Sequence, residues 1–265
     1  MKLTGERPLQ GATPDSLLAL HDAGYREVVA RLGAGLVVDV GCGVGDATAR
    51  LTGPGRVVVG VDYHAPTAIT AARTHAAGAA RFAAMDGARL AIRGRSADAV
   101  VSSHIIEHFV APESHVAELA RVLRTPGTAF VITPNGPADF ENPFHVHLFE
   151  PLQLASLLRL FFEEVEVLGL EGDDVLKADF ATRRARGERL LRLDVLRLRR
   201  RLPRRWYVWA YERALPLAYR ALGRSSGVGS GIDASHLSVT DVIRPDTPVL
   251  LALARRPRPV VDRCA

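Results

Sequence analysis

Between residues 36 and 133, short apolar runs alternate with segments whose apolar residues recur every three or four positions. The longer apolar runs are residues 36–40, 56–61, 97–102 and 128–133, and a shorter run follows residue 81. Runs of this kind are typical of strands that are buried on both faces. Strands that alternate with helices predict a parallel sheet connected by right-handed crossovers.

Further elements flank this region on both sides. Residues 13–32 predict a helix, with Leu18 and Tyr25 among the residues of its buried side. After a long loop at 134–151, residues 152–162 predict a second helix and residues 164–170 an outer strand, in which apolar residues alternate with acids. Residues 249–254 predict the final strand of the sheet.

The pattern changes between residues 171 and 246. Leucines lie among arginines at roughly helical spacing, and two further apolar stretches follow, which predicts a two-helix insertion. We therefore divide the chain into four parts. They are an N-terminal helical cap (1–34), an α/β core (35–170), a helical arginine-rich insertion (171–246) and a final core strand with a tail (247–265).

The most informative motif lies where the first apolar run ends. Asp39 is followed by three glycines at alternate positions, Gly41, Gly43 and Gly45. Glycine has no Cβ atom, so it adopts positive φ angles and lets a ligand approach the backbone closely. Because open α/β sheets bind ligands at the carboxyl ends of their strands, this turn predicts a nucleotide-binding loop.

Acids beside the turn indicate which nucleotide binds. Asp62 ends the second apolar run, and its carboxylate is suited to accept hydrogen bonds from both hydroxyls of a ribose. Asp39 would repel a pyrophosphate but suits an amino group. The spacing of the three glycines also differs from the Gly-x-Gly-x-x-Gly of dinucleotide-binding enzymes.

At residues 35–170 the chain resembles the class I S-adenosylmethionine-dependent methyltransferases, whose first motif is acid-x-Gly-x-Gly-x-Gly. The resemblance implies a doubly wound, mostly parallel seven-stranded sheet and a leading helix that covers S-adenosyl-L-methionine. It also implies that Asp39 and the glycines lie near the methionine part, Asp62 on the ribose and Asp86 against the adenine amino group. The expected cofactor site further includes three neighbours of these motifs: Tyr63, Gly87 and Ser103.

Two histidines follow the fourth predicted strand. His104 and His108, with Glu107 between them, match the inverted zinc-peptidase pattern, but that pattern requires a helix and further ligands. Methyl transfer to a hydroxyl requires removal of its proton, and histidine is suited to that task. His108 and His104 are therefore candidate bases, although either histidine could instead bond a backbone carbonyl as a structural residue. Glu107 is a candidate to orient a histidine or to cap a helix.

A third candidate follows the fifth predicted strand. His145 and His147 lie between Phe144 and Phe149, in a segment where the resembled family shapes its acceptor pocket. We expect His145 to face the acceptor. The His-x-His alternation suits a metal, but no third ligand is evident in the sequence, so no metal site is expected. A Thr-Pro-Asn sequence at 133–135 resembles a motif of nucleic-acid amino-methyltransferases, but that motif belongs after the fourth strand.

The net charge of +5 is unevenly distributed, because residues 183–205 hold eleven arginines against two acids. Three interpretations stay open for this segment: a solvated helix or homodimer arm, a lid over an anionic acceptor, and peripheral contact with a membrane surface through arginines and the nearby Trp206 and Trp209. The same charges suit RNA, but no RNA-binding module is recognisable.

Two cysteines, Cys42 and Cys264, cannot form a disulfide framework, and the N-terminus lacks an apolar signal core. We expect a soluble cytoplasmic protein. The functional hypothesis is a methyltransferase that acts on a hydroxyl of a small metabolite or glycan precursor. Two alternatives remain: methylation of a lipid-linked or RNA acceptor, and a cofactor-binding scaffold or regulator without turnover.

Overall fold

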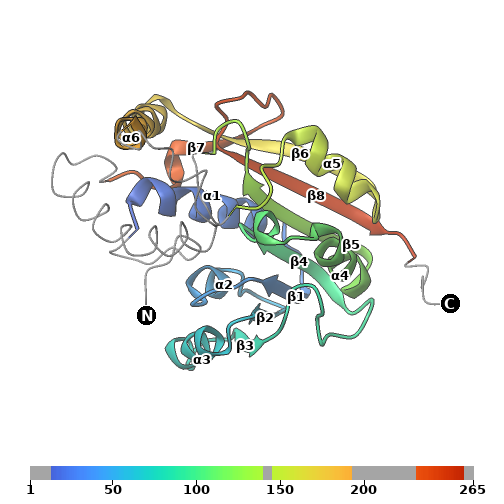
Figure 1. Cartoon of the computed structure of the whole chain (residues 1–265). Helices are drawn as coiled ribbons and strands as arrows, with labels where there is room; N and C mark the ends of the chain where they lie inside the picture. Colours follow the sequence, from blue (N-terminus) through green and yellow to red (C-terminus); the bar gives the residue numbers. More distant parts are fainter. Residues whose placement is uncertain (1–12, 140–144, 193–230, 260–265) are drawn as a thin grey trace.

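The computed structural model describes residues 13–139, 145–192 and 231–259. One eight-stranded sheet runs through the molecule in the order β3-β2-β1-β4-β5-β8-β6-β7 (Figure 1). The strands are β1 (Gly35–Val40), β2 (Arg56–Asp62), β3 (Arg81–Ala84), β4 (Ala97–Ser103), β5 (Leu123–Pro134), β6 (Phe162–Gly172), β7 (Leu237–Thr240) and β8 (Val249–Pro257). The first five are parallel to one another, as the sequence predicts, and β8 lies antiparallel between β5 and β6.

Helices cover both faces of this sheet. They are α1 (Asp15–Arg31), α2 (Asp46–Arg50), α3 (Ala65–Thr74), α4 (Pro112–Val122), α5 (Pro151–Arg159) and α6 (Asp174–Arg192). One hydrophobic cluster joins α1 to Val37 of β1, and a second joins α4 and α5 to Val38 of the same strand. Neighbouring residues of a strand point to opposite faces, and helices cover both faces here, so both valines are buried. Burial on both sides explains why the apolar run is unbroken.

The count of seven strands expected from the family resemblance was wrong by one. The additional strand, β7, pairs antiparallel with β6 at the edge of the sheet. It lies inside residues 171–246, which the sequence predicted to be helical. A four-residue edge strand needs apolar packing on few positions, so it leaves no apolar run in the sequence.

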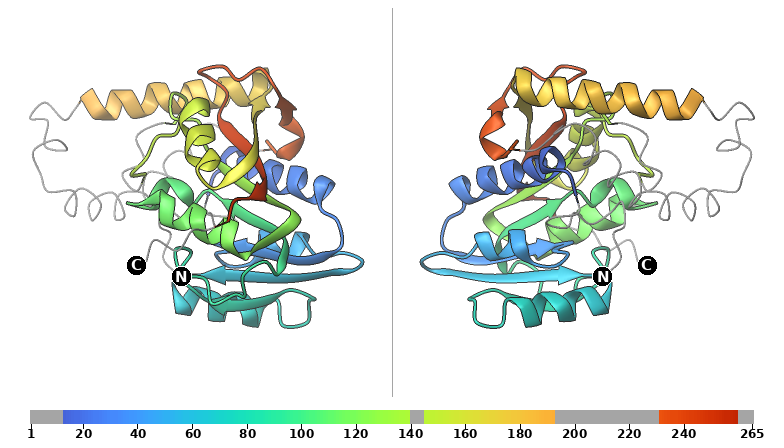
Figure 2. Two further views of the ribbon diagram at one scale, coloured as in Figure 1. Left: turned by 90° about the vertical axis from the view of Figure 1, so that its right-hand side faces the viewer. Right: turned by 90° about the vertical axis from the view of Figure 1, so that its left-hand side faces the viewer.

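The rest of the predicted insertion is described only in part. α6 is a long helix that lies near β6 and β7 at one end of the sheet (Figure 2). Most of the arginine-rich segment at 183–205, with the proposed two-helix pattern beyond residue 192, lies outside the described residues. No helix in the described ranges combines the length and hydropathy needed to span a membrane.

Candidate functional site

The glycine turn after β1 is built on left-handed backbone. Gly41, Gly43 and Gly45 have φ angles of +82°, +54° and +87°. A Cβ atom at Gly41 would overlap the side chain of Ile105, whereas a Cβ at Gly43 would meet nothing within 4 Å. Gly41 is therefore required by packing, and Gly43 presents bare backbone to open space.

Gly45 supports the turn from behind. Its backbone caps the N-terminus of α2, and a Cβ there would lie 2.6 Å from the ring of Phe82. It does not line the pocket described below. We conclude that Gly45 shapes the turn, whereas Gly41 and Gly43 form its cavity-facing surface.

Asp62 is fixed by the backbone at the end of β2. Its Oδ2 accepts a hydrogen bond of 3.2 Å from the Gly43 N–H, and its Oδ1 accepts one of 2.9 Å from the His64 N–H. The side chain is held in the pocket wall at 5% exposure. This acid is thus positioned before any ligand arrives.

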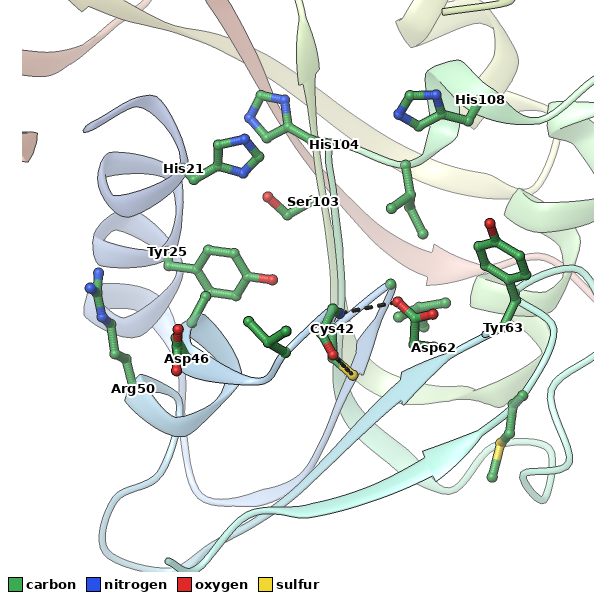
Figure 3. Close-up of a pocket in the computed structure, with 18 of the residues that line it drawn as sticks. His21, Tyr25, Cys42, Asp46, Arg50, Asp62, Tyr63, Ser103, His104 and His108 are labelled. Carbon is green, nitrogen blue, oxygen red and sulfur yellow. Dashed lines mark hydrogen bonds between the residues drawn. The ribbon is translucent and has the colours of Figure 1, made fainter. Parts of the chain in front are cut away.

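A cavity of about 610 Å³ opens above the carboxyl ends of β1, β2 and β4, within the range of roughly 300–1,000 Å³ that is typical of small-molecule sites. In Figure 3, His21, His104 and His108 line one side of it, and Cys42 and Asp62 the other. The fold brings most of the sequence-predicted site residues into its wall. They are Gly41, Gly43, Asp62, Tyr63, Asp86, Gly87, Ser103, His104 and His108.

Asp39 lies behind the wall rather than in it. The side chain is fully buried, and it accepts hydrogen bonds from the Tyr25 hydroxyl at 3.0 Å and from Thr48 Oγ1 at 2.6 Å. Burial raises the pKa of Asp39 to about 6, although both hydrogen bonds oppose this shift. In this structure Asp39 positions Tyr25, which does line the cavity.

Helix α1 supplies cavity residues that were not predicted as site residues. Leu18, His21, Asp22 and Tyr25 all line the cavity. Their spacing of three and four places them on one helix face. Polar residues on a face that is otherwise buried are the feature of the sequence from which this part of the site could have been predicted. Asp22 also pairs with Arg50 of α2 at 2.7 Å, which joins the covering helix to the glycine-turn helix.

His104 occupies a strained position at the end of β4. Its φ of +53° is uncommon for a residue with a side chain. The ring lies 4.1 Å from that of His21, and its Nε2 atom is buried without a hydrogen-bond partner among the described residues. Burial holds the pKa of His104 well below 6.5, and the neighbouring His21, His145 and His108 lower it further.

Glu107 is buried next to His104, behind the cavity wall. Its side chain is 2% exposed, Oε2 accepts a hydrogen bond of 3.0 Å from Thr133 Oγ1, and Oε1 lies 3.8 Å from His104 Nδ1. Burial raises the pKa of Glu107 to about 7, opposed chiefly by His145. Glu107 therefore lies close to a cavity histidine without a hydrogen bond to it, and its orienting role stays a prediction.

His145 does not line the cavity, in contrast to the acceptor-facing position expected for it. Its ring centroid lies 5.0 Å from that of His108, so it backs a cavity histidine. His147 points elsewhere and stacks on Phe149 at 5.5 Å. Phe144, the other aromatic residue of this segment, lies outside the described residues.

Comparisons with known proteins agree with this geometry. Residues 38–131 match a family model described as a methyltransferase domain. A protein of Mycolicibacterium smegmatis, named a probable S-adenosylmethionine-dependent methyltransferase, is 30% identical over 183 residues, which cover 66% of this chain and 68% of that protein. A second relative of similar name, from Mycobacterium tuberculosis, is 32% identical over 180 residues, or 64% of each chain.

Among solved structures, a methyltransferase of Thermotoga maritima, described as a possible histamine N-methyltransferase, has a TM-score of 0.58 at 14% identity, with 91% of each chain covered. At this identity the likeness concerns the fold alone. The fold and the position of the glycine-turn cavity are those of the class I, Rossmann-like methyltransferases. On the sequence relationship as well, the chain belongs to the S-adenosylmethionine-dependent methyltransferases.

The cavity suits the cofactor of this family, S-adenosyl-L-methionine. Gly43 leaves open space beside the turn, and the Asp62 carboxylate is held in the wall by backbone donors. Asp86 lies in the same wall, and its Oδ1 accepts a 2.9 Å hydrogen bond from the Ala88 N–H. The chain thus presents both acids and the bare turn to one cavity.

Proposed function

We propose that this enzyme methylates a hydroxyl group of a small metabolite or glycan precursor in the cytoplasm. Bound S-adenosyl-L-methionine supplies an electrophilic methyl group on its sulfonium. In the proposed arrangement Asp62 binds the ribose hydroxyls, Asp86 the adenine amino group and the glycine turn the methionine part. The cavity histidines then face the acceptor.

The observation that carries the choice of a hydroxyl is the placement of His104. A hydroxyl must lose its proton as it attacks, so a base has to lie within reach of it. His104 is in the cavity wall, and its Nε2 is buried without a hydrogen-bond partner in the described part of the chain. The lowered pKa keeps the ring neutral at pH 7, as a base must be before it accepts a proton. A strained backbone angle maintained at such a position is common at functional sites.

The acceptor oxygen gives its proton to Nε2 of His104 and forms a bond to the methyl carbon, while the bond between that carbon and sulfur breaks. The products are a methyl ether and S-adenosylhomocysteine, and His104 returns its proton to solvent. The protein aligns the two reactants in the cavity, which His21 and Ile105 help to line.

The test is incubation of the purified protein with methyl-labelled cofactor and fractionated cell extract, followed by identification of the labelled product. We expect the label on oxygen, and a label on nitrogen or carbon would contradict the proposal. His104→Asn, which tolerates a left-handed backbone, should lower kcat by about 10²–10⁴-fold and retain cofactor binding. His236→Ala, on a residue outside the cavity, is the matched control.

A further inference from the structure

Two segments that are distant in the chain meet beneath the cavity. Glu107 and His108 follow β4, whereas His145 follows β5. The backbone N–H groups of Val146 and His147 donate hydrogen bonds of 2.8 and 3.1 Å to the carbonyl of Glu107, which fixes one segment on the other. As a result, one potential ligand atom from each of Glu107, His108 and His145 lies within 4.8 Å of the other two.

The Glu107 carboxylate has a free coordination position at the centre of this cluster. Thr133 occupies Oε2, whereas Oε1 is buried and accepts no hydrogen bond from any described residue. A buried carboxylate oxygen without a donor is costly, and buried charges are normally paired or bound to a metal. Oε1 lies between two imidazoles, 3.8 Å from Nδ1 of His104 and 4.0 Å from Nε2 of His145.

The ring of His145 is oriented from its far side. Its Nδ1 hydrogen-bonds Oδ2 of Asp139 at 2.5 Å, which directs Nε2 toward Glu107. Histidines that bind metals typically donate their other ring N–H to a carboxylate in this way, which fixes the tautomer and strengthens the ligand. Asp139 therefore has the position of a supporting residue for a metal ligand.

We propose that Glu107, His108 and His145 together bind one divalent transition-metal ion. Two imidazoles and one carboxylate form a donor set of catalytic metal sites, which keep open positions for water or substrate. A tetrahedral ion with bonds of about 2.1 Å separates its ligands by about 3.4 Å, so the side chains close by roughly 1 Å when it binds. His147, which the sequence paired with His145, is not part of this set.

Besides the base His104, the ion provides a second group that binds the acceptor, and this part of the inference rests on the proposed function. His108 lines the cavity, so the open positions of the ion lie on the cavity side of the cluster. An acceptor hydroxyl bound there is polarised by the ion and lies near His104, which takes its proton. The proton transfers from oxygen to His104, and the ion leaves the reaction unchanged.

Metal binding is tested separately from methyl transfer. The full chain, purified without a histidine tag and treated with a chelator, is titrated with ZnCl₂ by calorimetry and with CoCl₂ by visible absorption. We expect one equivalent of either ion to bind, with a cobalt spectrum typical of nitrogen and oxygen ligands. The absence of stoichiometric binding of both ions would overturn the proposal and leave the cluster as a hydrogen-bonded network.

Variants locate the site. Glu107→Gln and His145→Asn should each weaken binding by at least about 100-fold, and Asp139→Asn by about 10–100-fold. His147→Ala, two residues from a ligand, should bind normally. Retained binding of S-adenosylhomocysteine shows that each variant is folded. Wild-type metal affinity in both Glu107→Gln and His145→Asn would contradict the assignment.

The two proposals fail in different ways. If the chelated enzyme methylates a hydroxyl at full rate and binds neither ion, the metal site is excluded and O-methylation stands. If one ion binds with the expected variant pattern but the label appears on nitrogen, the metal site stands and the hydroxyl acceptor is excluded.

Discussion

The backbone N–H of Gly43 donates a hydrogen bond to Oδ2 of Asp62, which joins the turn after β1 to the acid that ends β2. The two adjacent parallel strands end side by side, so a motif split over two segments becomes one surface of the cavity. Substitutions at Asp62 and at the glycine turn test the two sides of this contact separately.

Asp62→Ala should raise the Kd for S-adenosylhomocysteine by roughly 10–100-fold, because hydrogen bonds to a charged group contribute about 1.5–3 kcal/mol. Calorimetric titration of wild type and variant measures this difference. Asp246→Ala removes an acid whose side chain is 63% exposed and serves as the control. An unchanged affinity in Asp62→Ala would exclude the proposed contact with the ribose.

Alanine at the glycine turn should act differently at two positions. Gly41→Ala places a methyl group against Ile105 on left-handed backbone, so we expect a loss of about 2–4 kcal/mol in the free energy of unfolding. Gly43→Ala meets no neighbour and should cost about 1–2 kcal/mol, yet it should weaken cofactor binding.

Urea denaturation and cofactor titration separate these two effects. Adding Ile105→Ala should restore part of the stability lost in Gly41→Ala, because it removes the overlapping side chain. Equal stabilities of the Gly41→Ala and Gly43→Ala variants would show that the contact with Ile105 is not the reason why position 41 requires glycine.

The Tyr25 hydroxyl should stabilise the fold through Asp39. Tyr25→Phe removes a donor from a fully buried carboxylate, at an expected cost of about 1.5–3 kcal/mol in the free energy of unfolding. Tyr63→Phe removes a hydroxyl from a residue that is 67% exposed and should change stability by less than about 0.5 kcal/mol. Chemical denaturation compares the pair, and equal effects would contradict the role of Asp39.

His115 should make stability depend on pH. The ring is fully buried between Ser102 and Gly87, and burial lowers its pKa to about 4, although the Gly87 carbonyl, Asp86 and Glu118 oppose the shift. The unfolded chain takes up a proton below pH 6.5 and the folded chain only near pH 4. The contribution of His115 to the free energy of unfolding is therefore fully present above pH 6.5 and is lost as the pH falls toward 4. The whole loss amounts to about 3 kcal/mol.

Asp39 acts in the opposite direction over part of this range, because its raised pKa favours the folded state at lower pH. Denaturation of wild type and His115→Gln between pH 7 and 4.5 isolates the histidine. We expect wild type to lose more stability than the variant over this range. Parallel pH dependence in the two proteins would assign the effect to other groups.

Much of the candidate cofactor site follows from local sequence. The apolar run at β1, the glycines behind it and Asp62 at the end of β2 are each a short-range pattern, and parallel strands bring their carboxyl ends to one edge. The same reasoning could not separate Asp39 from the ligand surface. Whether a side chain points into the cavity or behind it depends on the turn that follows, and on Tyr25 and Thr48, which occupy both carboxylate oxygens.

By itself, the sequence determined the α/β class, the parallel core and the cofactor of this protein, because periodicity and turn glycines act over a few residues. Only the tertiary structure decided that α1 brings His21 against His104, that β7 closes the edge beside β6, and that His145 joins Glu107 and His108. These contacts join segments far apart in the chain, and their geometry is set by packing and backbone hydrogen bonds that no local pattern encodes.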